Sequence, residues 1–171
     1  CLNVGCIPSK ALIHAAEAFA HARHQADGNA FGLSVAGPAL DFGKTVAWKD
    51  GIVTRLNSGV AGLLKRSKVN ILRGRGVMLD GKTCRVETDT GPETIRAEHV
   101  VIATGSEPMA LPNLPFGGKV ISSTEALSLP AVPASMAVVG AGYIGLELGI
   151  AYAKIGTKVT LVEAASRILP L

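Results

Sequence analysis

The chain has 171 residues, of which 48% are hydrophobic and 18% are charged, and its formal net charge at pH 7 is +4. This composition suits an α/β protein, and because the 17 basic residues are scattered along the chain, we expect no nucleic-acid partner. No apolar run is long enough to span a membrane, and no charged segment followed by an apolar one precedes Cys1. We therefore expect neither a membrane segment nor a signal peptide.

Two long helices are predicted in the first part of the chain. The alanine-rich residues 8–26 should form the first helix, starting at Pro8 or Ser9, and Ser9 could cap it. Glycine, asparagine and proline make residues 28–38 a loop. Apolar residues recur at helical spacing in residues 42–65, which predicts a second helix capped by Asp41.

The pattern changes to short strands after the second helix. Strands are expected at residues 69–72, 76–79, 83–87 and 99–105, the last one buried and running into a tight turn. Asp80-Gly81 is a hairpin signal. Residues 107–118 contain three prolines and indicate a linker. We expect a short helix at residues 123–127, then a βαβ unit: strand 136–139, helix 143–155 and strand 158–162.

The βαβ unit carries a dinucleotide fingerprint. Its six-residue turn is Gly140-Ala141-Gly142-Tyr143-Ile144-Gly145, a G-x-G-x-x-G pattern that follows an apolar strand and opens a helix. The first glycine permits the turn, the second lets a pyrophosphate approach the backbone, and the third lets the helix pack on the strand. Glu163 ends the next strand, where a carboxylate would accept from a ribose 2′-hydroxyl and repel a 2′-phosphate. This favours NAD over NADP, although Arg167 lies nearby; alternatively, the glycines only serve the turn.

Cys1 and Cys6 lie just before the first predicted helix. The positive end of that helix would lower the pKa of Cys6 and stabilise its thiolate. A disulfide that closes so short a loop adds little stability, so exchange with a substrate thiol is its more plausible use. A metal-binding pair and two unrelated buried thiols are the alternatives, and Cys84 is expected to be a packing residue.

The segment CLNVGCIPSK, residues 1–10, resembles the redox motif of the dihydrolipoamide dehydrogenases, which are flavin-dependent pyridine nucleotide–disulfide oxidoreductases. Mercuric and glutathione reductases are similar here but usually have Val in place of Leu2 and Ile7, and glutathione reductase tends to have Lys in place of Ser9. The turn Ile102-Ala103-Thr104-Gly105-Ser106 is similar to the family's second flavin-site turn. The resemblance extends through the G-x-G-x-x-G stretch to Glu147 and so covers essentially the whole chain.

The resemblance implies a role for each matching residue. Cys1 would exchange with the dithiol substrate, and Cys6 would face the flavin and form the charge-transfer thiolate. Lys10 would lie at the reactive edge of the flavin and pair with Glu147, although Glu147 could also be an ordinary exposed helix carboxylate. Gly74 and Gly76 resemble the loop that contacts the adenine half of FAD, or they are simply turns at strand ends.

The implied fold is α/β, with parts of two Rossmann-like FAD/NAD(P)-binding domains and a small β-meander. We place a partial FAD-binding domain at residues 1–112 and the first part of an NAD-binding domain at residues 113–171. The implied cofactors are FAD and NAD. The implied substrate is dihydrolipoamide on a lipoyl carrier domain, and the resemblance suggests a homodimeric, cytoplasmic enzyme that serves 2-oxo acid dehydrogenase complexes and cell redox homeostasis.

The chain is expected to be an internal fragment. The family's first flavin fingerprint should precede Cys1, and its His/Glu acid–base pair and dimerisation domain should follow Leu171. We therefore expect the fragment alone to be inactive and to lack tightly bound FAD, and an interaction module without redox chemistry is a further alternative. No metal site is expected, since a polar or interface face explains the helical spacing of four residues better: His14, Glu17, His21 and His24.

Overall fold

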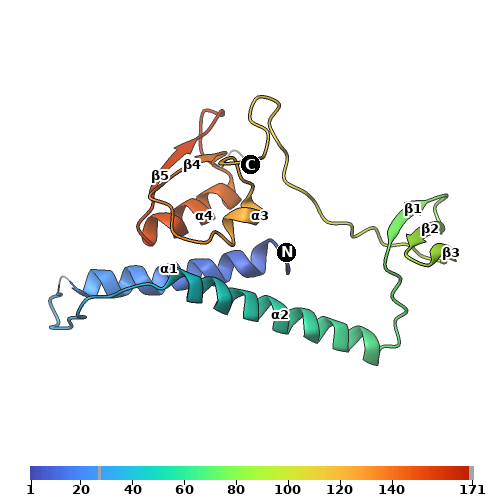
Figure 1. Ribbon diagram of the computed structural model, residues 1–171, viewed down its shortest axis with the longest axis horizontal. Coiled ribbons are helices and arrows are strands. Elements are labelled where there is room, and N and C mark those ends of the chain that lie inside the picture. The colour runs from blue at the N-terminus through green and yellow to red at the C-terminus, as the bar shows by residue number, and fades with distance from the viewer. Residues whose placement is uncertain (27, 170–171) are drawn as a thin grey trace. The chain divides into compact units, whose positions relative to one another are not determined.

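The computed structural model describes residues 1–26 and 28–169 and divides into two compact units. The first unit comprises Cys1–Gly59 and the chain from Pro108 onward, and the second comprises Val60–Glu107. Each unit has its own strands (Figure 1). The α/β class predicted from the sequence is confirmed. The domain boundary predicted between residues 112 and 113 stays a prediction.

Helix α1, Cys6–Ala26, starts two residues earlier than Pro8. Its first turn closes because the N–H of Ile7 donates to the Cys1 carbonyl and the N–H of Ser9 donates to the Gly5 carbonyl, both at 3.0 Å. The prediction that Ser9 caps the helix is wrong. Ser9 already lies inside the first turn, and its hydroxyl donates to the Cys6 carbonyl at 3.1 Å.

Helix α2, Phe42–Arg66, agrees with the helix predicted from its apolar spacing. Asp41 caps it as expected, because its side chain accepts the N–H of Lys44 at 3.0 Å. The helix ends at Arg66, and Lys68, two residues later, has a φ of 54° in the left-handed region. The N–H groups of Lys68 and Val69 then donate back to the carbonyls of Lys65 and Leu64, which satisfies the last turn without a glycine.

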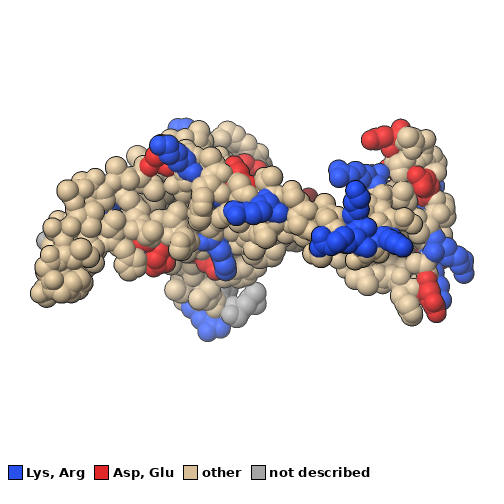
Figure 2. Space-filling model, turned by 90° about the horizontal axis from the view of Figure 1, so that it is seen from below, with Lys and Arg blue, Asp and Glu red and all other residues tan. Residues whose placement is uncertain are grey.

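The second unit contains an antiparallel β-meander in the order β1-β2-β3. Its strands are β1 Arg75–Met78, β2 Thr83–Thr88 and β3 Gly91–Arg96. The Asp80-Gly81 hairpin is confirmed: Met78 pairs with Cys84, and the Asp80 carboxylate accepts the N–H groups of Lys82 and Thr83 at 2.7 and 2.8 Å. Figure 2 shows both basic and acidic side chains on the face that it draws. Within β2, Arg85 pairs with Glu87 at 2.8 Å.

Two strand predictions in this part of the chain are wrong, and one strand was missed. Residues 69–72 and residues 99–105 are not strands, and β3 was not predicted. Val101 and Ile102 are 88% and 74% exposed, and within residues 1–26 and 28–169 no strand pairs with their segment. A strand needs a hydrogen-bonded neighbour as well as an apolar sequence, and here the neighbour is lacking.

The first unit contains the predicted βαβ unit. Strand β4, Ser135–Val139, and strand β5, Lys158–Val162, pair in parallel with Met136 opposite Val159, and helix α4, Tyr143–Lys154, connects them. Before them comes the short helix α3, Ser123–Ala126. It is held by a capping box, in which the Ser122 hydroxyl accepts the N–H of Thr124 while the Glu125 carboxylate accepts the N–H of Ser122.

The core of the first unit lies where α1, α3, α4 and the start of α2 meet. Tyr152 at its centre is fully buried, packs its ring 6.1 Å from that of Phe42, and donates its hydroxyl to the Ala126 carbonyl. Burial raises the pKa of Tyr152 to about 12. Leu12 and Ala16 bring α1 into the same cluster, so this core holds α1 against α4.

Candidate functional site

Cys1 and Cys6 form a disulfide, with their Cα atoms 4.5 Å apart. Both cysteines are exposed, and Cys6 is the first residue of α1. A thiolate released at Cys6 would therefore lie beside the unpaired N–H groups and the positive end of a 21-residue helix. This arrangement excludes the alternative of two unrelated buried thiols. Cys84 is a free thiol in β2 of the second unit.

Lys10 lies four residues after Cys6 in α1, so the two side chains share one face of the helix. Its ammonium donates to both carboxylate oxygens of Glu147, at 3.1 and 3.2 Å. Glu147 lies in the first half of α4, and the pair joins residues 137 apart in sequence. The sequence alone could not decide whether Glu147 was an ordinary exposed carboxylate, whereas the structure places it on Lys10.

A second ion pair joins the same two helices. Lys154 donates to Glu17 at 2.7 Å, again across 137 residues, so α1 and α4 run parallel with both pairs one heptad apart. The hydrogen bond from Lys154 and its charge lower the pKa of Glu17. An open cleft of about 410 Å³ lies between the two pairs and is lined by these residues: Lys10, Ile13, His14, Glu17, Glu147 and Ile150.

The glycine-rich turn connects β4 to α4, and each of its glycines has a different structural reason. Gly140 adopts a φ of 102°, which requires glycine in practice. A Cβ on Gly145 would lie 2.1 Å from the Gly140 carbonyl oxygen, so close packing requires that glycine. Gly142 has an ordinary φ of −75°, and a Cβ there would meet nothing within 4 Å. Contacts within the chain therefore do not explain glycine at 142, whereas the close approach of a ligand to the backbone would explain it.

The helix end behind this turn is open. Among residues 1–26 and 28–169, no side chain caps α4 at Gly142, and the first N–H groups of a helix have no acceptor within the helix itself. Such an end stabilises an anion through hydrogen bonds and the helix dipole. Free space at Gly142 together with an uncapped helix end fits a pyrophosphate group, and these residues would hold that part of a dinucleotide.

Glu163 follows β5 and lies beside the glycine-rich turn. One carboxylate oxygen accepts the N–H of Ala141 at 2.7 Å, and the other accepts the N–H of Ala165 at 2.8 Å. These backbone hydrogen bonds, from Ala165 and then Ala141, lower the pKa of Glu163. No sequence pattern predicts the bond to Ala141, because its donor is a main-chain N–H and any residue type can supply one.

The residues predicted to contact the flavin's nucleotide half lie in the second unit. Ala103, Thr104, Gly105 and Ser106 are exposed and outside any strand, and Gly105 has a φ of 78°. Gly76 lies in β1, where a Cβ would come within 3.3 Å of the Cys84 sulfur. A Cβ on Gly74 would lie 2.1 Å from the Glu87 carbonyl oxygen, so strand packing alone explains that glycine.

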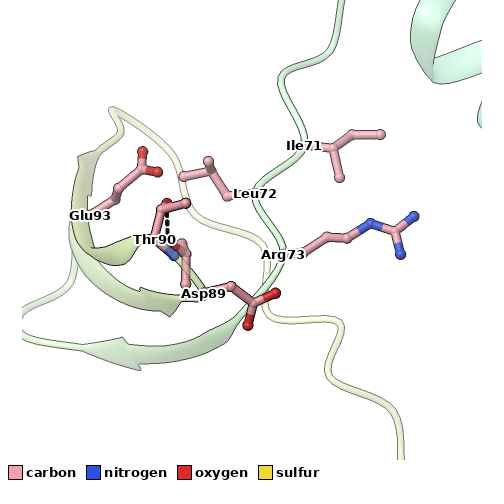
Figure 3. A pocket seen from close by; sticks show the side chains of 7 residues that line it. Ile71, Leu72, Arg73, Asp89, Thr90 and Glu93 are labelled. Atoms are coloured by element: carbon pink, nitrogen blue, oxygen red, sulfur yellow. Dashed lines mark hydrogen bonds between the residues drawn. The ribbon is translucent and has the colours of Figure 1, made fainter.

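A pocket of about 380 Å³ lies in the second unit, between the segment before β1 and the β2–β3 turn (Figure 3). Ile71 and Leu72 supply its apolar side, and Arg73, Asp89 and Glu93 supply charge. None of the predicted flavin-contacting residues lines it, so the structure does not bring that predicted set together around this pocket.

The helical row of polar residues on α1 does not converge on one point. Glu17 pairs with Lys154, and the ring of His14 lies 6.2 Å from that of Trp48. Across residues 1–26 and 28–169, no group of three or more His, Cys, Asp or Glu side chains could hold a metal ion. Within those same residues, no helix is long and apolar enough to cross a membrane.

Sequence reasoning missed Lys49, a buried cation in α2. Its side chain is 3% exposed, and its ammonium donates to Asp50 at 2.7 Å and to Ser128 at 2.8 Å. The bond to Ser128 ties α2 to the segment that follows α3. The apolar spacing of α2 could have suggested it, because Lys49 falls between Val46 and Ile52 on the helix surface.

Comparison with known proteins agrees with this geometry. The family described as pyridine nucleotide-disulphide oxidoreductase matches residues 1–171, so the chain belongs to that family. Among its relatives, a dihydrolipoyl dehydrogenase of Pseudomonas aeruginosa is 56% identical over 171 residues, and one of Geobacillus stearothermophilus is 46% identical over 169 residues. Each alignment covers 99% of this chain, but the chain spans only 37% and 35% of these two relatives.

A solved structure resembles the chain over nearly its whole length. The HOCl-induced flavoprotein disulfide reductase RclA from Escherichia coli superimposes with a TM-score of 0.74 and 28% sequence identity. The superposition covers 99% of this chain and 34% of that protein. Shared fold and sequence thus place the disulfide and the glycine-rich turn in a family of disulfide reductases.

Proposed function

We propose that this chain carries the redox disulfide and the nucleotide turn of a dihydrolipoyl dehydrogenase, an enzyme that oxidises dihydrolipoamide to lipoamide. One observation carries the proposal: an exposed disulfide lies at the start of α1, one helical turn from an ammonium that Glu147 holds in place. The relatives named dihydrolipoyl dehydrogenase support this choice over the mercuric and glutathione types.

The disulfide performs the first half of the reaction by thiol exchange. One thiolate of the substrate attacks the Cys1 sulfur, the Cys1–Cys6 bond breaks, and Cys6 leaves as a thiolate. The second substrate thiol, on losing its proton, attacks the substrate sulfur bound to Cys1 and releases Cys1. The substrate dithiol has then become a disulfide, and the protein disulfide has become a dithiol, so two electrons have moved to the protein.

The position of each residue supports its role in this exchange. The start of α1 stabilises the departing Cys6 thiolate, which favours attack at Cys1 rather than at Cys6. Lys10 keeps a positive charge on the same face of the helix, and its two hydrogen bonds to Glu147 restrict where that charge can lie. We assign Cys1 to the substrate side and Cys6 to the flavin side.

FAD bound beside Cys6 would accept the electron pair, and NAD bound at the glycine-rich turn would carry it away as hydride. Lys10 and Glu147 would lie toward the flavin ring, and Ala103–Ser106 with Gly76 toward its nucleotide part. Gly140–Gly145 would hold the NAD pyrophosphate, with Glu163 on the adenosine ribose. The whole protein is proposed to be a cytoplasmic homodimer acting on lipoyl carrier domains of 2-oxo acid dehydrogenase complexes.

The test uses the full-length protein that contains this sequence. We expect NAD reduction with dihydrolipoamide, and no comparable oxidation of NADH or NADPH with glutathione disulfide or mercuric ion. Cys1→Ser and Cys6→Ser should each abolish dithiol oxidation, because serine cannot form the exchangeable disulfide, while Cys84→Ser serves as the matched control and should retain it. Turnover by Cys1→Ser and Cys6→Ser at the wild-type rate would refute a role for the disulfide.

The same proposal predicts that these 171 residues alone hold no tightly bound flavin. Stoichiometric flavin absorbance that stays with the isolated polypeptide through gel filtration would contradict the assignment of the flavin site to a larger protein.

A further inference from the structure

Glu163 makes contacts that its proposed role on the ribose does not require. Its carboxylate bridges two backbone N–H groups, one in the glycine-rich turn at Ala141 and one in its own following segment at Ala165. Ala141 is fully buried with Glu163 in place, and removing the carboxylate takes away the acceptor of its N–H. An unpaired buried N–H costs about 1–3 kcal/mol, and the turn has to move to avoid that cost.

The bond from Ala141 belongs to a set of three between the turn and the chain that leaves β5. The N–H of Gly140 donates to the Val162 carbonyl at 2.8 Å, and the N–H of Leu169 donates to the Ala141 carbonyl at 3.0 Å. Both backbone groups of Ala141 are thus held, one by a side chain and one by the main chain. The Ala141 N–H bond is the only one of these three whose acceptor is a side chain, so it is the one a substitution can remove.

The turn needs such support because of the residues that form it. Gly140 has φ 102° and Gly142 has open space around its Cα, and glycine has more accessible backbone conformations than any other residue. When a loop samples several conformations, its apparent affinity for a ligand is the intrinsic affinity multiplied by the fraction of molecules in the binding conformation. Fixing Ala141 between two glycines reduces that loss before the nucleotide arrives.

We propose that Glu163 is a positioning residue for the pyrophosphate turn, which it holds in its binding conformation through the N–H of Ala141, in addition to any contact with the ribose. This inference rests on the proposed function, since it assumes that the turn binds a dinucleotide. Each carboxylate oxygen has two acceptor sites, so a carboxylate that accepts a backbone N–H on each oxygen can also accept a ribose hydroxyl.

A ligand without ribose hydroxyls separates the two roles. Binding of NAD and of 2′,3′-dideoxyadenosine 5′-diphosphate is measured by calorimetry on the full-length holoprotein, for wild type and Glu163→Ala. If Glu163 positions the turn, Glu163→Ala weakens the dideoxy ligand about tenfold, as expected for one charge-assisted hydrogen bond, and weakens NAD by at least as much. Glu163→Gln keeps one acceptor oxygen, so its affinities should lie between those of wild type and Glu163→Ala. Glu98→Gln removes the same charge at an exposed position elsewhere and should change neither affinity.

Unchanged affinity for the dideoxy ligand, alongside weakened NAD binding, would overturn the inference and leave Glu163 as a ribose contact only. Hydrogen exchange in the nucleotide-free protein gives an independent readout. The amide of Ala141 should exchange faster in Glu163→Ala and not in Glu98→Gln, and equal exchange in all three proteins would also overturn it. Failure of wild type to bind NAD would instead refute the proposed function.

Discussion

Substituting alanine at two glycines of the same turn separates ligand binding from folding. A Cβ at Gly142 meets nothing within 4 Å and sits at a φ of −75°, which any residue adopts. Alanine is a poorer helix cap than glycine by some tenths of a kcal/mol, but it also restricts the unfolded chain by about 0.4–1 kcal/mol, so the free energy of unfolding should change by less than about 1 kcal/mol. The added methyl group instead occupies space on the ligand's path to the backbone.

Gly145→Ala is the matched control because it adds the same methyl group three residues later. There the Cβ lies 2.1 Å from the Gly140 carbonyl oxygen and 3.1 Å from a Val138 methyl carbon. Helix α4 has to shift away from β4, and overpacking of this kind costs about 1–3 kcal/mol or more. Gly145→Ala should therefore lower stability as well as nucleotide binding.

The assay pairs urea unfolding with NAD titration by calorimetry in the full-length protein. Gly142→Ala should unfold at nearly the wild-type midpoint and bind NAD at least tenfold more weakly, which corresponds to about 1.4 kcal/mol. Wild-type affinity in Gly142→Ala would refute the reasoning, since the space around Gly142 would then not be where the ligand approaches. An unfolding midpoint of Gly142→Ala as low as that of Gly145→Ala would also refute the reasoning, because the methyl group at 142 would then disturb the fold itself.

Three further predictions follow from the ion pairs and the Glu163 carboxylate. Lys49→Ala should destabilise the protein by about 3 kcal/mol in urea unfolding, because it removes a side chain that is 3% exposed and opens a cavity. Lys49→Met keeps the volume and should cost far less, and equal losses would contradict this account. Backbone hydrogen bonds lower the folded pKa of Glu163, so its contribution to stability is present above the ordinary value of 4.5 and is lost as pH falls through the folded pKa. The difference in unfolding midpoint between wild type and Glu163→Gln should therefore shrink from pH 6 to pH 3, and a constant difference would contradict this prediction. Glu17→Lys and Lys154→Glu should each lower the free energy of unfolding, and the double variant should be about 0.5 kcal/mol more stable than the sum of the two losses predicts. A double-mutant cycle measures this coupling energy, and strictly additive losses would disprove it.

The elements that the sequence predicted well are those whose signal is local. The apolar period of α2, the Asp41 cap and the Asp80-Gly81 hairpin each depend on residues within a few positions of one another. The same holds for the start of α3, where Ser122 and Glu125 form the capping box. Local rules suffice for these elements because their main partners lie in the same segment.

The failures share one physical cause, which is dependence on a pairing partner. Residues 99–105 have the composition of a buried strand, yet a strand exists only beside another, and Val101 is 88% exposed. Strand β3 begins with Gly91-Pro92 and has little apolar character, yet β2 pairs with it along its whole length. A pairing partner decides both cases: β3 pairs with the neighbouring strand β2 from Thr88 and Gly91 onward, and among the described residues no strand pairs with residues 99–105.

The candidate site shows the same division. The cysteine pair and the glycine-rich turn were found from spacing alone, because their chemistry is contained in short motifs. The family resemblance supplied the expectation that Lys10 meets Glu147, which spacing could not give. Neither source suggested that Glu163 holds the Ala141 N–H or that Lys49 is buried against Ser128.

The two ion pairs between α1 and α4 also encode a direction. Along α1 the charges run Lys10 then Glu17, and along α4 they run Glu147 then Lys154, so parallel packing joins opposite charges at both places. Turning either helix end for end would set lysine against lysine and glutamate against glutamate, and sliding α4 back by seven residues would bring Lys10 to Lys154. The charge order on two segments more than a hundred residues apart thus disfavours incorrect docking of the helices as well as favouring the correct one. A reversed or shifted α4 is disfavoured by these charges even without the packing around Tyr152.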